Sequence, residues 1–209
     1  MRVAPEGWPF ISVAAAVLAA FGLLHWWVPF VLWLPIAIWV VAFFRDPDRS
    51  RVRGADLVLA PADGRVVSVI PIDEPVFLGG PATRIAIFMN VFDVHVNRYP
   101  TDGFIKLRRY TPGKFLNAGV DKASTENEQA TLGLEQPRGR LLVRQIAGLV
   151  ARRIVTDHPE GFAAKQGERL GLIRFGSRVD LFVPPNVAVS VKTGDVTRAG
   201  ETVVGRWMT

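Results

Sequence analysis

The sequence predicts a mostly β protein of the α+β class, with short helices and an N-terminal hydrophobic helical hairpin. Two observations predict it. From Trp8 to Phe44 the chain has no Asp, Glu, Lys or Arg, which is typical of helices in an apolar environment. From Arg45 onward, short apolar runs alternate with Gly, Pro and Asp, which is typical of strands joined by close turns.

The apolar N-terminal stretch divides near Gly22–Pro29. The first half, Phe10–Leu24, is short for a membrane span. The second half, Val28–Phe44, comes closer to the roughly 20 residues that a helix needs to cross the hydrocarbon core. Trp26 and Trp27 suit an interfacial turn between the halves. We therefore expect a two-pass, membrane-associated hairpin.

Positive charge at both ends of this stretch predicts its orientation. Because basic residues favour the cytoplasmic side, Arg2 and the exit arginines place both ends and the following domain on the cytoplasmic face of the cell membrane. The length of the stretch and its basic exit argue against a cleaved signal peptide. Pro29 and Pro35 keep an interfacial or re-entrant hairpin as an alternative. The exit arginines are Arg45, Arg49, Arg51 and Arg53.

The remaining chain is rich in strand-like segments. One helix is expected over Lys122–Thr131, since Ser124 is followed three residues later by Asn127 and then Glu128, as at a helix start. The segments 60–67 and 194–204 look like a barrel-sandwich fold of the lipoyl or biotinyl kind. The expected strands are 57–60, 65–70, 83–91, 104–110, 140–150, 170–175, 179–183 and 187–191, with a last strand near 204.

Composition excludes several kinds of function. The absence of cysteine excludes disulfides, thiol catalysis and thiolate metal sites. A net charge of +6 favours anionic partners, and we expect an anionic membrane surface rather than nucleic acid, because the aromatic residues gather in the apolar segment instead of alternating with arginines. No metal-ligand spacing and no Gly-rich phosphate loop is present.

Three residues on separate segments could form a nucleophile, a base and an orienting acid. They are Ser177, His95 and Asp63. Gly176 leaves its own carbonyl open to attack by the next hydroxyl. Taken singly, Gly176-Ser177 and Asp63-Gly64 indicate turns, and His95 indicates a core histidine.

Seven segments in order resemble the phosphatidylserine decarboxylase family in its short prokaryotic form. The resemblance covers nearly the whole chain, and the order and spacing carry more weight than any single motif. The segments are the apolar N-terminus, Ala60-Pro61-Ala62-Asp63-Gly64, Asp93-Val94-His95, Pro112-Gly113-Lys114-Phe115, Glu126-Asn127-Glu128, Gln145-Ile146-Ala147-Gly148 and Phe175-Gly176-Ser177-Arg178.

The resemblance implies a proenzyme that cuts itself between Gly176 and Ser177 into chains 1–176 and 177–209, which stay together as a heterodimer, with higher oligomers left open. Ser177 would become a covalent pyruvoyl group, the cofactor, which forms a Schiff base with the substrate. The implied reaction converts phosphatidylserine to phosphatidylethanolamine and carbon dioxide. Asp63 would be the acidic member of the self-processing triad.

One position departs from the family. Longer members carry two histidines three residues apart, whereas here His95 is followed by Arg98. Either His95 serves both self-cleavage and decarboxylation or another base does, with His158 as the fallback. Arg98 and Arg178 are candidates for holding the substrate carboxylate or phosphate, and equally for surface charge.

Other functions stay open at this point. A membrane-tethered serine hydrolase could use the same three residues, and the same decarboxylation could act on a related phosphoserine lipid. A non-enzymatic lipoyl-type carrier would need a lysine at a hairpin tip, for which Lys192 is the candidate. We divide the chain into a hydrophobic hairpin 1–44, a basic linker 45–56 and a catalytic domain 57–209.

Overall fold

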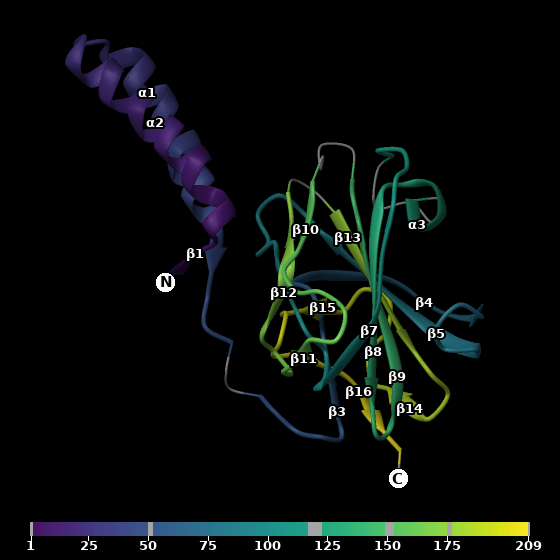
Figure 1. Cartoon of the computed structure of the whole chain (residues 1–209). Coiled ribbons are helices and arrows are strands. Elements are labelled where there is room, and N and C mark those ends of the chain that lie inside the picture. Colours follow the sequence, from purple (N-terminus) through teal and green to yellow (C-terminus); the bar gives the residue numbers. More distant parts are fainter. Residues whose placement is uncertain (1, 50–51, 117–122, 149–152, 175–176, 209) are drawn as a thin grey trace. The chain divides into compact units, whose positions relative to one another are not determined.

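The computed structural model describes residues 2–49, 52–116, 123–148, 153–174 and 177–208. The chain divides into two compact units, Met1–Asp48 and Arg49–Thr209. Figure 1 shows the first unit as a pair of helices and the second as a group of sheets. Each unit has its own packing.

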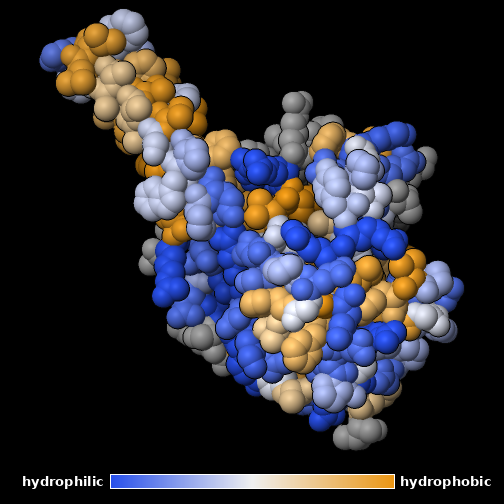
Figure 2. Space-filling model, in the orientation of Figure 1, coloured by the Kyte–Doolittle hydropathy of each residue, from blue (hydrophilic) through white to orange (hydrophobic). Residues whose placement is uncertain are grey.

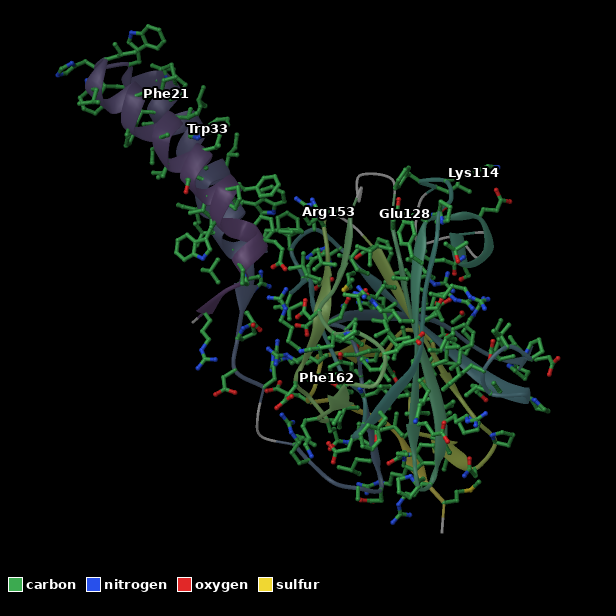
Figure 3. The ribbon with its side chains drawn as sticks, in the orientation of Figure 1. Phe21, Trp33, Lys114, Glu128, Arg153 and Phe162 are labelled. Atoms are coloured by element: carbon green, nitrogen blue, oxygen red, sulfur yellow. The ribbon has the colours of Figure 1, made fainter. Side chains whose placement is uncertain are left out.

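The first unit is a helical hairpin closed at its base by a short strand pair. Trp33 Nε1 donates to the Ala14 carbonyl at 3.1 Å, which fixes one helix against the other. Figure 3 marks Phe21 and Trp33 along this pair, and Figure 2 shows the apolar surface that the pair exposes. Its elements are β1 (Arg2–Val3), η1 (Pro5–Gly7), α1 (Trp8–Leu23), α2 (Trp27–Phe43) and β2 (Arg45–Asp46).

The lengths of the two helices reverse the sequence expectation. Among the described residues, one helix, Pro5–Leu23 with 19 residues, is long and apolar enough to cross a membrane. The second apolar helix, α2, has 17 residues and contains Pro35. The first helix is longer than expected because η1 continues into α1, which adds a turn before Trp8.

The second unit contains an eight-stranded antiparallel sheet that curls around the main core (Figure 1). Its strand order is β11-β7-β8-β9-β13-β5-β4-β15. The bounds are β4 (Gly64–Glu74), β5 (Gly80–Met89), β7 (Gly103–Thr111), β8 (Gln129–Gln136), β9 (Gly139–Ile146), β11 (Ala163–Ala164), β13 (Ser177–Val183) and β15 (Val196–Thr197).

Two three-stranded sheets complete the unit, in the orders β10-β12-β6 and β14-β16-β3. Alternate residues of the large sheet enter the core, as Val179, Leu181 and Val183 do in β13. The bounds are β3 (Leu57–Leu59), β6 (Val96–Arg98), β10 (Ile154–Thr156), β12 (Arg169–Ile173), β14 (Val187–Val189) and β16 (Val203–Trp207). The mostly β prediction and the predicted N-terminal hairpin are confirmed.

The helix expected over Lys122–Thr131 is wrong for most of its length. Lys122 lies outside the described residues, and over the rest of the range the structure has a short helix, α3 (Ala123–Glu126), before β8 begins at Gln129. Strand β8 pairs with β7 on one side and with β9 on the other. Pairing along both edges, with Leu132 and Leu134 buried in the core, outweighs the local helix signal.

Candidate active site

Ser177 is the first residue of β13 and lies in the interior. It pairs with Met89, the last residue of β5, while the next residue, Arg178, pairs with Ile146 of β9. Directly opposed residues of an antiparallel pair share a face, so Ser177 and Met89 both point to the core. Ser177 is fully buried, and its Oγ has no hydrogen-bond partner among the described residues. Gly176 lies outside the described residues.

His95 is fully buried and lies just before β6. Its Nδ1 is 3.0 Å from the Asp93 carbonyl oxygen. A carbonyl can only accept, so Nδ1 carries the proton and Nε2 is the basic nitrogen. In β6, Val96 pairs with Leu172 of β12, which places His95 at the end of β12 that runs on toward Ser177.

His158 lies toward the other end of β12, because it follows Thr156, which pairs with Gly171. Its Nδ1 is 3.0 Å from the Tyr99 hydroxyl, and its ring stacks on Phe162 at 3.7 Å between centroids. Burial, and then the nearby Asp157 carboxylate, raise the pKa of Tyr99 well above its ordinary value. Figure 3 shows Phe162 away from Arg153, which precedes the opposite end of β10. The register therefore favours His95 over His158 as the base.

Asp63 precedes β4 and is almost fully buried. One carboxylate oxygen accepts from Arg49 Nη2 at 2.9 Å, and the other accepts from the Ala199 backbone N–H at 2.7 Å. The next residue, Gly64, has φ 141°, and a Cβ there would lie 2.1 Å from the Phe88 carbonyl oxygen. This close approach brings Asp63 to the end of β5 that carries Met89.

The register thus brings the three segments of the predicted triad to one end of the second unit. Gly64 approaches the backbone beside Met89, and Ser177 pairs with Met89 from the other side. His95 enters from β6. The arrangement offers a buried hydroxyl, a histidine with a basic Nε2 and an ionisable carboxylate, which suits proton transfer to and from Ser177.

The two predicted substrate arginines are both buried and engaged with other groups. Arg98 Nη1 donates to the Gly167 carbonyl at 3.0 Å. Arg178 points to the face of β13 opposite Ser177, where its Nε donates to Asp180 at 2.6 Å. Ser124 Oγ also donates to Asp180, at 2.8 Å.

A chain of polar side chains that no sequence motif singles out ends at Met89, the residue that pairs with Ser177. Thr156 Oγ1 donates to Gln145 Oε1 at 3.1 Å, and Gln145 Nε2 donates to Asn97 Oδ1 at 2.8 Å. Asn97 Nδ2 then approaches Met89 Sδ at 3.6 Å. We call these three residues the Thr156–Gln145–Asn97 chain. Gln145 and Asn97 are fully buried in a mostly apolar core, and such burial is the signal that sequence alone does not carry.

A cavity of about 340 Å³ opens next to this chain. Ala130 and Thr156 line it, and Ala130 pairs with Gln145. Arg108 lines the cavity too, is exposed, and donates to the Thr156 carbonyl at 3.1 Å. Among the described residues, no group of His, Asp or Glu side chains is arranged to hold a metal ion.

Comparison with known proteins agrees with the resemblance seen in the sequence. The sequence model of the family described as phosphatidylserine decarboxylase matches residues 36–205. A phosphatidylserine decarboxylase proenzyme of Magnetococcus marinus is 49% identical over 98% of this chain and 94% of its own length. Proteins of the same name from Symbiobacterium thermophilum (49%, 98% and 95%) and Nitratidesulfovibrio vulgaris (45%, 99% and 95%) are similar throughout. The chain therefore belongs to the phosphatidylserine decarboxylase family.

Proposed function

We propose that this chain is a phosphatidylserine decarboxylase that matures by cutting itself between Gly176 and Ser177. The observation that carries the proposal is the Ser177 hydroxyl, which is fully buried and has no partner among the described residues. A buried hydroxyl without a hydrogen bond costs stability, and such groups gather where chemistry takes place. The relatives are named as proenzymes, which supports a maturation step.

A pyruvoyl group derived from Ser177 fits this position. The Ser177 side chain faces the core beside Met89, and its Oγ has no partner among the described residues. Loss of that hydroxyl on conversion to a pyruvoyl group would therefore break no side-chain hydrogen bond. Once formed, the group would supply an electrophilic carbonyl and an electron sink for the loss of carbon dioxide. Both arise from the chain itself and need no bound metal.

The residues support each proton transfer of self-cleavage. His95 Nε2 would take the proton of Ser177 Oγ as Oγ bonds to the Gly176 carbonyl carbon. The C–N bond then breaks, the nitrogen takes a proton, and an ester replaces the amide. Removal of the Ser177 Cα proton breaks the Cβ–O bond and releases the Gly176 carboxylate. Water then displaces ammonia from what remains of Ser177.

Asp63 would hold the positive charge that develops on His95 during these transfers. Its carboxylate is fixed by Arg49 and by the Ala199 N–H, so its charge can stabilise an imidazolium without rearranging, while the Asp93 carbonyl orients the ring through Nδ1. In the substrate reaction, His95 would serve again, because it lies at the Ser177 end of β12 and His158 does not.

A lipid substrate suits the rest of the molecule. The exposed Arg108 at the cavity edge is better placed to meet a lipid phosphate than Arg98 or Arg178, which are both buried. The apolar hairpin would hold the protein on the cytoplasmic face of the cell membrane, whose anionic headgroups attract the juxtamembrane arginines. Family membership favours decarboxylation over the serine hydrolase alternative.

The intact mass of the purified full chain tests the proposal. We expect two chains divided after Gly176, with the smaller one blocked to N-terminal sequencing, and release of carbon dioxide from phosphatidylserine vesicles. Ser177→Ala should remain one chain and be inactive. A single uncut chain that still decarboxylates the lipid would contradict the cofactor assignment. An ether-linked phosphoserine lipid, assayed in parallel, separates the two substrate alternatives.

A further inference from the structure

We propose that the side-chain amide of Asn97 donates a hydrogen bond to the oxyanion that forms when Ser177 Oγ adds to the preceding carbonyl. The inference rests on the proposed self-cleavage and assigns the donor that this step needs. A carbonyl under attack gains a full negative charge on oxygen, and a preorganised N–H in a dry site is the usual means of stabilising it.

The first support is the poor partner that Asn97 Nδ2 has in the uncut chain. Its contact is Met89 Sδ at 3.6 Å, and a thioether sulfur is a weak acceptor. The amide carries two N–H bonds and is fully buried. A second buried asparagine shows the usual pairing with oxygen: Asn127 Nδ2 donates to the carbonyls of Leu116 and Ala147. Asn97 therefore holds donor capacity that no oxygen of the described residues uses.

The second support is that the orientation of this amide is set from behind. Thr156 donates to Gln145, and Gln145 Nε2 occupies Asn97 Oδ1 at 2.8 Å. The opposite orientation would place the Asn97 oxygen against a sulfur that has no proton to donate. The Thr156–Gln145–Asn97 chain therefore points the NH₂ group at Met89. The amide itself does not need to turn when the negative charge appears.

The third support is the position of Met89. It pairs with Ser177 across β5 and β13, and opposed side chains in such a pair lie about 5 Å apart at Cβ. The Asn97 amide, in contact with Met89 Sδ, therefore approaches the same side of the sheet as Ser177 Oγ. Because a methionine side chain is flexible, its sulfur can yield to a charged oxygen.

In the step assigned to Asn97, no electrons enter or leave. The Oγ–carbon bond forms and the proton of Oγ passes to His95. The carbonyl electron pair moves to oxygen, where Asn97 Nδ2–H donates to it. Collapse returns the pair, breaks the C–N bond and delivers a proton to nitrogen. Asn97 is unchanged at the end.

The rate of chain splitting tests the proposal directly, in full-length protein freshly purified as the uncut form. Asn97→Ala and Asn97→Asp should each slow splitting about 100-fold, the loss expected for one oxyanion donor. Asn97→Asp keeps the shape, and its ionised carboxylate accepts but cannot donate. Asn97→Ser, whose hydroxyl can donate, should recover part of the rate. Asn186→Ala is the matched control, because it removes the same amide from an exposed turn, and it should split within threefold of the original rate.

Treatment with hydroxylamine tests whether Asn97 acts in forming the ester at Ser177. Hydroxylamine cuts an ester much faster than an amide, so it should fail to split Asn97→Ala if Asn97 acts in forming the ester. Rapid splitting by hydroxylamine would show that the ester accumulates, and would overturn the assignment. If Asn97→Ala does not fold, Thr156→Val tests the same chain from its half-buried end and should slow splitting several-fold.

Two further outcomes separate this inference from the proposed function. Normal splitting of Asn97→Ala would overturn the inference alone, and where that variant does not fold, so would normal splitting of Thr156→Val. An original chain that never splits under any condition would overturn the proposed function, and with it the role of Asn97.

Discussion

Arg49 and Asp63 form a buried ion pair at 2.9 Å, although the sequence places them on opposite sides of a strand. The same guanidinium reaches Glu201 through its other nitrogen at 2.7 Å. Arg49 is the first residue of the second unit and follows directly on the helical hairpin. The spacing of the arginines predicts that Arg49 belongs to a juxtamembrane charge cluster, whereas in the structure its side chain fixes Asp63, the predicted triad acid.

Removing Arg49 should therefore harm both stability and maturation. Arg49→Ala removes the ion pair that Arg49 makes with the buried Asp63 carboxylate, which should lower the free energy of unfolding by about 3 kcal/mol. Splitting at Ser177 should slow, because Asp63 would no longer be held in place. Denaturant titration and intact mass measure the two effects. Glu201→Gln is the control, since it removes the second partner and leaves the Arg49–Asp63 pair. Normal splitting of Arg49→Ala would contradict this role.

Gly64→Ala should disrupt the same end of the sheet. The residue has φ 141°, and its new Cβ would meet the Phe88 carbonyl oxygen at 2.1 Å. We expect a loss of about 2 to 3 kcal/mol in unfolding free energy and slower splitting. Gly80→Ala lies at the other end of the same strand pair, has no atom within 4 Å of its new Cβ, and should change stability by less than about 0.5 kcal/mol. Equal effects of the two changes would argue against the close approach.

Substitutions of His95 and His158 should affect splitting and stability differently. His95→Gln should block splitting while the protein remains folded. His158→Ala should still split, but should lose about 1 to 3 kcal/mol of stability, because the buried Tyr99 hydroxyl loses its partner. Intact mass and thermal unfolding of both variants measure this difference. Splitting in His95→Gln together with a block in His158→Ala would reverse the assignment of the base.

Tyr99 should make the protein sensitive to alkali. Its pKa is raised mainly by burial, so the folded state favours the protonated phenol. That stabilisation is complete below pH about 10, the ordinary tyrosine value, and is lost as pH rises above it. Unfolding free energy measured from pH 8 to 11 should fall less steeply in Tyr99→Phe. Absorbance titration should show Tyr110, which is exposed, ionising before Tyr99. An identical slope in the variant would contradict the burial effect.

Local pattern was enough to predict the helical hairpin and most strands of the second unit. Segments such as 83–91 and 179–183 are rich in apolar and β-branched residues, as expected for strands that contribute to a buried core. The failure at 122–131 has a physical cause: the first residues of the strand, Gln129 to Thr131, pair with residues of β7 and β9 that lie more than ten positions away. No local window contains that information.

The candidate site divides in the same way. Ser177, His95 and Asp63 could be selected from sequence because each belongs to a distinctive segment. Asn97 and Gln145 stand in two of those neighbourhoods, yet their importance depends on a 2.8 Å contact across 48 positions. Arg178 looks like a substrate ligand in sequence, but strand alternation turns it to the face opposite Ser177, toward Asp180.

The place of β13 within the large sheet has a consequence for the matured protein. This strand is clamped along both edges, by β5 and by β9, and β16 is likewise flanked by β14 and β3. The Ser177 nitrogen would leave as ammonia, but residues 178–183 would keep the ladder bonds that they make with these neighbours. The 177–209 chain would therefore remain part of the sheets that the larger chain forms, and its dissociation would require the domain to unfold.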